Sequence, residues 1–137
     1  MKHTKATILG KGAVMSGLVA CALALPIVAQ DKAMGWADAL TPGEWTVSNR
    51  DGSEAQKICL RSAKDLLMLR HKAGTCQVLD VEEKGSRLTV QFQCGRAGYG
   101  RTVLRRETNA LVQLQSQGIV NSKHYNVSGE ARRTGAC

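Results

Sequence analysis

The sequence has few aromatic residues: two tryptophans, two tyrosines and one phenylalanine among 137 residues. Proteins that bind single-stranded nucleic acid stack successive bases on aromatic side chains, so this scarcity argues against nucleic acid as a ligand. Proline is also scarce, with two residues, and no low-complexity linker divides the chain. A chain of this length without such a linker is typical of one domain.

Acidic residues are absent from the first 30 positions, and the first of them is Asp31. Three lysines within the first 11 residues precede an apolar run over residues 13–29. A positive segment, a short apolar segment and a small residue at its end are the pattern of a secretory signal peptide. The sequence therefore predicts a signal peptide over residues 1–29, cleaved after Ala29, and a periplasmic mature chain that begins at Gln30.

Two alternatives to cleavage stay open. The apolar run could be a retained anchor, although it contains Pro26 and is shorter than the roughly 20 apolar residues that a spanning helix needs. Residues 18–21, Leu-Val-Ala-Cys, also fit the lipobox pattern, in which Cys21 becomes an acylated N-terminus and makes the protein a membrane-anchored lipoprotein. Against the lipobox, the apolar run continues beyond Cys21, where lipoproteins usually turn polar.

The mature chain is moderately basic. The whole sequence has 19 basic and 11 acidic side chains, and loss of three lysines with the signal leaves 16 − 11, a net charge of +5. Such a charge favours weak attraction to anionic surfaces, which in an envelope are phospholipid or lipopolysaccharide headgroups. Anionic envelope lipid and an envelope protein are therefore the partners that we expect.

Four cysteines remain after the predicted cleavage: Cys59, Cys76, Cys94 and Cys137. Zinc sites need close cysteine pairs with histidines nearby, whereas the gaps here are 16, 17 and 42 residues long. An even number of well-separated cysteines in a small exported domain predicts two disulfides. We expect Cys59–Cys76, because a short helix between them would bring two strand ends to one sheet edge, and Cys94–Cys137, because a terminal strand gains most from being tied down.

The mature sequence predicts a mainly β domain over residues 42–137 after a leader over residues 30–41. Turn signals separate alternating segments, which is typical of an antiparallel meander that forms a curved sheet, a sandwich or a partial barrel. Ser62 with Asp65 three residues later forms a capping box and predicts one short helix of two to three turns, ending before Gly74. The strands are expected at residues 44–48, 54–60, 76–83, 87–94, 101–108, 110–117 and 123–133.

Alternation also predicts the core. Residues 87–94 give the clearest pattern, with the apolar side chains on one face and Gln91 and Gln93 on the other. The side chains that we expect to be buried are Trp45, Leu88, Val90, Phe92 and Val127.

Three ordered features carry a resemblance to a known family: Pro-Gly-Glu-Trp at residues 42–45, Lys-Ile-Cys-Leu at residues 57–60, and Gly-Glu-Ala-Arg-Arg-Thr-Gly-Ala-Cys at residues 129–137. With the two middle cysteines, the chain resembles the proteobacterial secreted family known as domain of unknown function 3617 (DUF3617). The resemblance covers about residues 40–137. It implies an envelope location and a compact β domain, and it implies no activity.

Four arginines form the most suggestive candidate site, as possible anion contacts: Arg96, Arg101, Arg105 and Arg106. An arginine-rich strand can bind phosphate through bidentate hydrogen bonds, or it can protect a sheet edge from aggregation. At period two, Arg101 and Arg105 share one face of their strand and Arg106 lies on the other. Arg132-Arg133, near the chain end, could pair with neighbouring acidic residues.

No pattern predicts catalysis. His71 is expected at a solvent-facing helix end and His124 on the polar face of the last strand, and the sequence has no nucleophile elbow of the Gly-x-Ser-x-Gly type. Residues 95–100, rich in glycine, precede a strand and so differ from a phosphate loop, which opens a helix. The chain is therefore predicted to be a non-catalytic binding module without a cofactor or metal; a small periplasmic enzyme of unrecognised type is the alternative.

Overall fold

A computed structural model describes residues 32–53 and 55–137. The predicted signal peptide, with its cleavage site after Ala29 and the lipobox residue Cys21, lies outside the described residues. Among the described residues, no helix is long and apolar enough to cross a membrane.

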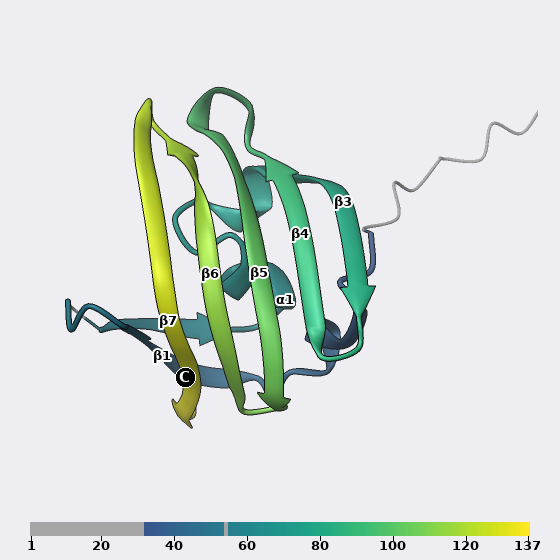
Figure 1. Cartoon of the computed structure of the whole chain (residues 1–137), viewed down its shortest axis with the longest axis vertical. Coiled ribbons are helices and arrows are strands. Elements are labelled where there is room, and N and C mark those ends of the chain that lie inside the picture. Colours follow the sequence, from purple (N-terminus) through teal and green to yellow (C-terminus); the bar gives the residue numbers. More distant parts are fainter. Residues whose placement is uncertain (1–31, 54) are drawn as a thin grey trace, which may run out of the picture. The chain divides into compact units, whose positions relative to one another are not determined.

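Seven antiparallel strands of the described chain form a sheet in the order β2-β1-β7-β6-β5-β4-β3 (Figure 1). Strands β3 to β7 follow one another as a meander, and β1 joins the sheet by pairing with β7. The strands are β1 (Gly43–Asn49), β2 (Gln56–Leu60), β3 (Gln77–Lys84), β4 (Arg87–Gln93), β5 (Gly98–Thr108), β6 (Leu111–Val120) and β7 (Lys123–Gly135). The prediction of a mainly β meander with one short helix and two disulfides is confirmed.

The helix α1 (Ala63–Leu67) begins at the predicted capping box, in which the Asp65 carboxylate accepts a hydrogen bond of 2.9 Å from the Ser62 backbone N–H. The predicted length of two to three turns is wrong, because the helix has five residues. A regular helix buries only one stripe of its surface, whereas the four residues from 66 to 69 are all buried. The chain leaves helical geometry at Met68, which lets these consecutive side chains reach the core.

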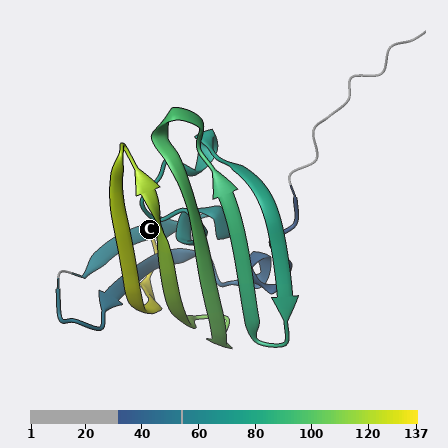
Figure 2. The ribbon, with the colours of Figure 1, turned by 45° about the horizontal axis from the view of Figure 1, so that its top comes forward.

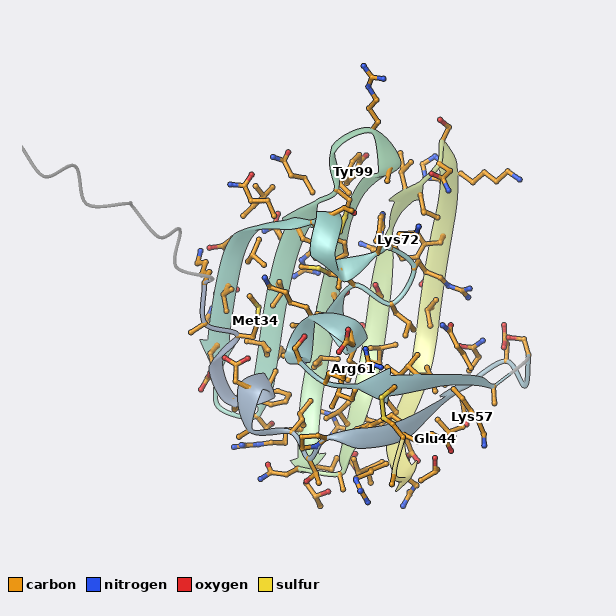
Figure 3. The ribbon with its side chains drawn as sticks, turned by 180° about the vertical axis from the view of Figure 1, so that it is seen from behind. Met34, Glu44, Lys57, Arg61, Lys72 and Tyr99 are labelled. Carbon is orange, nitrogen blue, oxygen red and sulfur yellow. A yellow bond between two sulfur atoms is a disulfide. The ribbon has the colours of Figure 1, made fainter. Side chains whose placement is uncertain are left out.

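The β1–β2 hairpin and α1 pack on one face of the sheet, called the inner face here (Figures 2 and 3). Strand β7 makes this possible because its first part pairs with β6 and its last part with β1, so the sheet folds over itself. The core lies between these layers. All five side chains predicted to be buried are no more than 3% exposed, and Gln91 and Gln93 are exposed on the opposite, outer face, as predicted.

Three short 3-10 helices complete the described fold: η1 (Gly35–Ala39), η2 (Ala73–Thr75) and η3 (Gly95–Ala97). The first lies within the predicted leader. Its neighbours Met34 and Leu40, like Trp36 within it, are buried in the core. The hydrophobic core therefore begins before the Pro42-Gly43 turn.

The two disulfides are Cys59–Cys137 and Cys76–Cys94, with Cα atoms 5.6 Å and 4.0 Å apart. The predicted pairing of Cys59 with Cys76 and of Cys94 with Cys137 is therefore wrong. The helix after β2 does not return the chain to the same sheet edge: β2 and β3 are the two opposite edges of the sheet. Cys76 and Cys94 instead flank the Gln77–Gln93 pair and close the β3–β4 hairpin.

Candidate functional site

The structure does not gather the four candidate arginines into one cluster. Arg101 and Arg105 lie on the outer face of β5 and are exposed. Arg106 lies on the inner face, where its guanidinium is 5.2 Å from the centroid of the Trp36 ring. Arg96 is exposed within η3, between β4 and β5. Only Arg101 and Arg105 therefore remain together as candidate anion contacts on the outer face.

Edge protection does not explain these two arginines. Strand β5 pairs with β4 on one side and with β6 on the other, so it is an interior strand. The edges that need protection are β2 and β3. The edge-strand interpretation of Arg101 and Arg105 is therefore wrong, and their place on the outer face calls for another role.

A third arginine, which the sequence analysis missed, joins them. Arg87 on β4 is the cross-strand partner of Arg105. Arg105 forms an ion pair of 3.1 Å with Glu107, whereas Arg87 and Arg101 have no hydrogen-bond or ion-pair partner among the described residues. Arg87 directly follows the Lys-Gly-Ser turn, and at period two its side chain lies on the same outer face as that of Gln91. This alternation in the sequence could have identified it.

The carboxylate of Glu82, on the edge strand β3, interacts electrostatically with Arg101. The pKa of Glu82 lies below its ordinary value, chiefly because Lys84 donates a hydrogen bond to it and adds an attractive charge. The charge of Arg101 contributes to the same lowering. The Glu82 carboxylate therefore faces the positive charges of both Lys84 and Arg101.

Neutral amide side chains surround the unpaired arginines. Gln91 and Gln117 are the cross-strand neighbours of Arg101 on its two sides, and Asn126 follows next to Gln117 on β7. Gln115 and Ser128 form the adjacent pair on β6 and β7. The alternating Gln residues of β6 are visible in the sequence, but only the strand register shows that they adjoin the arginines.

Three depressions on the outer face share residues and form a continuous groove. The first, of about 370 Å³, includes Tyr99 and shares Arg101, Gln117 and Asn126 with the second, of about 280 Å³. The second shares Val103 and Gln115 with a third, smaller one beside Arg87. We call this continuous surface the outer groove; its lining includes Arg50, Arg87, Gln91, Tyr99, Arg101, Val103, Arg105, Gln113, Gln115, Gln117 and Asn126.

The two histidines of the described chain differ in environment. His124 is exposed on the outer face of β7, as predicted, at the Tyr99 end of the groove. His71 was predicted to face solvent, and this is wrong: its Nε2–H donates a hydrogen bond of 3.0 Å to the Ile119 carbonyl, and its Nδ1 is buried without a partner. The ring packs edge-on against Phe92 and Tyr125, 5.4 Å and 5.7 Å away.

Room for the Tyr125 hydroxyl comes from two glycines of the strands beneath it. Gly100 and Gly118 are opposite each other on β5 and β6, and a Cβ on either would meet the Tyr125 hydroxyl. Burial raises the pKa of Tyr125, while the nearby Ser116 hydroxyl and the charge of Arg70 act in the opposite direction. These side chains fill the inner face and belong to the core.

No arrangement of catalytic or metal-binding residues is apparent in the described chain. His124 and Ser128 are four residues apart on one strand, about 13 Å at the usual rise per residue, so they form no nucleophile–base pair. Among residues 32–53 and 55–137, no three His, Cys, Asp or Glu side chains converge as a metal site.

Another cavity, of about 470 Å³, lies between the β1–β2 hairpin and β7, with Val47, Leu69 and Arg70 in its lining.

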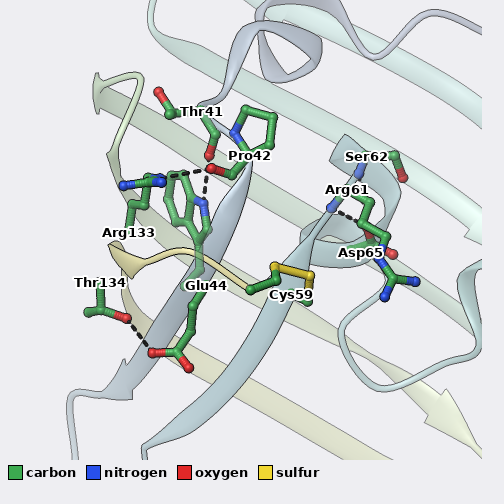
Figure 4. Close-up of a disulfide and its surroundings, with 11 residues drawn as sticks. Thr41, Pro42, Glu44, Cys59, Arg61, Ser62, Asp65, Arg133 and Thr134 are labelled. Atoms are coloured by element: carbon green, nitrogen blue, oxygen red, sulfur yellow. Dashed lines mark hydrogen bonds between the residues drawn. A yellow bond between two sulfur atoms is a disulfide. The ribbon is translucent and has the colours of Figure 1, made fainter.

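The two sequence motifs at the ends of the domain meet in space (Figure 4). The Arg133 side chain donates a hydrogen bond of 2.8 Å to the Pro42 carbonyl, and Thr134 donates one of 3.1 Å to Glu44. Gly43, with φ of 138°, lies so close to the Gly135 carbonyl that a side chain would not fit. Arg132 pairs with Glu130 at 3.0 Å, in keeping with the pairing expected of it. These motifs therefore hold the start of β1 and the end of β7 together.

The fold and the groove define a small antiparallel β domain, closed by two disulfides, with a polar groove on its outer face. The model of the family described as "Protein of unknown function (DUF3617)" matches residues 40–137. The chain therefore belongs to this family, as the sequence motifs predict. No curated protein and no solved structure matches the chain.

Proposed function

We propose that the protein is an exported, non-catalytic binding domain that holds an anionic ligand of the cell envelope in the outer groove. The observation that carries this proposal is the pair of unpaired guanidinium groups, Arg87 and Arg101, on interior strands of the sheet. Neither guanidinium forms an ion pair or a hydrogen bond with another described residue, so both can contact a ligand. A guanidinium forms bidentate hydrogen bonds with phosphate or carboxylate groups.

The spacing of the two arginines indicates an extended ligand. Arg87 is opposite Arg105, and Arg101 is four residues away from Arg105 on the same face of β5. At the usual rise per residue, the two backbone positions are about 13 Å apart along the strands. At this spacing each guanidinium can bind a separate acidic group, so a chain or surface with repeated negative charges fits both.

Export of the domain is supported by its cysteines and by its N-terminal sequence. All four cysteines of the described chain form disulfides, and disulfides persist in oxidising compartments such as the bacterial periplasm. We expect the intact mass of the exported protein to correspond to an N-terminus at Gln30. A mass that corresponds to an acylated Cys21 would contradict cleavage after Ala29 and establish the lipoprotein alternative.

The binding proposal is tested with anionic vesicles. We expect the mature domain to sediment with phosphatidylglycerol vesicles at low salt, and the double variant R87Q/R101Q to bind at least about tenfold more weakly, because a hydrogen bond to a charged group contributes about 1.5–3 kcal/mol. Added salt should weaken the wild-type protein in the same direction, because it screens exposed charges.

A matched control removes the same charge elsewhere. Arg61 and Lys72 are exposed on the side of the molecule that carries α1 (Figure 3), so the variant R61Q/K72Q should bind within about twofold of the wild type. Equal losses in the two double variants would show that net charge alone attracts the protein. Equal losses in the two variants, or no vesicle binding by the wild type, would contradict the proposal that the outer groove binds anionic surfaces.

A further inference from the structure

We infer that the ligand of the outer groove is an acidic oligosaccharide, a chain of sugar units that carries carboxylate or phosphate groups. This inference rests on the proposed function, and it adds the chemical class of the ligand. Three features of the groove support it: its length, its amide side chains and the exposed ring of Tyr99.

The groove is long and continuous. Its ends are marked on β5 by Tyr99 and Arg105, six residues apart on one face, which is about 20 Å along an extended strand. Neighbouring depressions share Arg101 and Gln117 at one junction and Val103 and Gln115 at the other. A continuous surface of this length suits several linked units better than one isolated anion.

The amide side chains of the groove suit a ligand that carries hydroxyl groups. Each Gln or Asn side chain has an N–H₂ donor and a carbonyl acceptor side by side, and neighbouring sugar hydroxyls can accept from the first and donate to the second. A phosphate group offers acceptors only, so phosphate alone would leave the amide carbonyls of Gln115, Gln117 and Asn126 unused. The amide-rich centre of the groove therefore suits a ligand with many hydroxyl groups, such as a sugar chain, better than phosphate alone.

The charges of the outer face are also modest for a membrane-binding surface. Arg105 is paired with Glu107 at 3.1 Å, and Arg132 is paired with Glu130 at 3.0 Å. Among the described residues, the arginines that line the groove without a carboxylate contact are Arg50, which donates a hydrogen bond of 3.4 Å to Gln113, Arg87 and Arg101. A few guanidiniums separated by amides match occasional acidic groups along a mostly neutral polymer.

Tyr99 supplies a flat apolar surface at one end of the groove. Its residue is 56% exposed, and among the described residues the only other large hydrophobic residue with such exposure is Leu79, at 52%. Its cross-strand neighbours are Gln93 and Ile119. The tyrosine ring therefore lies beside an amide group on one side and an aliphatic group on the other. An amphipathic ring of this kind can cover the C–H face of a sugar while its hydroxyl remains in water.

The test uses tetragalacturonic acid, lipid-free phosphorylated core oligosaccharide of lipopolysaccharide, neutral maltotetraose and phosphatidylglycerol vesicles as probes. We expect the oxidised mature domain to bind at least one of the two acidic oligosaccharides, and maltotetraose at least about tenfold more weakly, by titration calorimetry. The carboxylated and phosphorylated probes distinguish the two sources of charge. R87Q/R101Q should remove the preference for the acidic probes.

Tyr99→Ala should weaken binding of the acidic oligosaccharide about twofold to twelvefold, which corresponds to an aromatic contact of about 0.5–1.5 kcal/mol, with an unchanged thermal transition. Leu79→Ala, an equally exposed residue on β3, should bind like the wild type. Equal affinities of Tyr99→Ala and the wild type for the acidic oligosaccharide, or vesicle binding without oligosaccharide binding, would overturn the oligosaccharide as ligand and leave the proposed function intact. Absence of binding to every probe would overturn both.

Discussion

Removal of the Cys59–Cys137 disulfide, in the double variant C59A/C137A, is expected to lower the free energy of unfolding by about 4 kcal/mol. The bond joins residues 78 positions apart in the sequence, and in the chain-entropy model a crosslink of that span restricts the unfolded chain by about 4–5 kcal/mol. The bond also attaches the last residue, beyond β7, to the edge strand β2. Denaturant unfolding of the wild-type and variant proteins measures the difference.

The second disulfide is the matched control for the first. Cys76 and Cys94 are 18 positions apart, so C76A/C94A is expected to cost about 3 kcal/mol, less than C59A/C137A. Peptide mapping without reduction should recover one peptide pair for each bond. A peptide that links Cys59 to Cys76 or Cys94, or a larger loss in C76A/C94A than in C59A/C137A, would contradict the arrangement of the strands.

Truncation of Phe92 to alanine is expected to cost about 3–5 kcal/mol, the usual range for a large side chain lost from a well-packed core. Phe92 is 1% exposed, its ring packs against His71, and its neighbour across the strands is Gly100, which has no side chain to fill the cavity. Thermal or denaturant unfolding measures the loss.

Gln91→Ala serves as the control for Phe92→Ala, since Gln91 is the adjacent outward residue of the same strand. Its loss should change the free energy of unfolding by no more than about 0.5 kcal/mol. A cost below about 1 kcal/mol for Phe92→Ala, with a larger cost for Gln91→Ala, would show that β4 presents the other face to the core.

Local patterns in the sequence predicted local features well. Alternation over residues 87–94 predicts which side chains are buried, because successive residues of a strand point to opposite faces. The capping box at Ser62 predicts the start of α1, because both of its hydrogen bonds lie within four residues. Period two likewise places Arg106 on the face opposite Arg101 and Arg105, and the structure confirms this.

Features that depend on the order of the strands could not be predicted in the same way. The disulfide pairing follows from β2 and β3 being at opposite edges of the sheet, and no local pattern around Cys59 or Cys76 contains that information. The outer groove depends on register as well. Gln117 and Asn126 adjoin Arg101 only because β5, β6 and β7 pair in one particular alignment.

The outer groove as the ligand-binding surface is tested most directly by recording amide and arginine side-chain chemical shifts of the oxidised mature domain. The domain is titrated separately with the two acidic oligosaccharides and with phosphatidylglycerol bicelles. We expect the largest changes at Tyr99, Arg101 and Gln117 and at the guanidinium of Arg87, with little change around α1. Changes confined to the cavity lined by Val47, Leu69 and Arg70, or spread evenly over both faces, would contradict the proposed site.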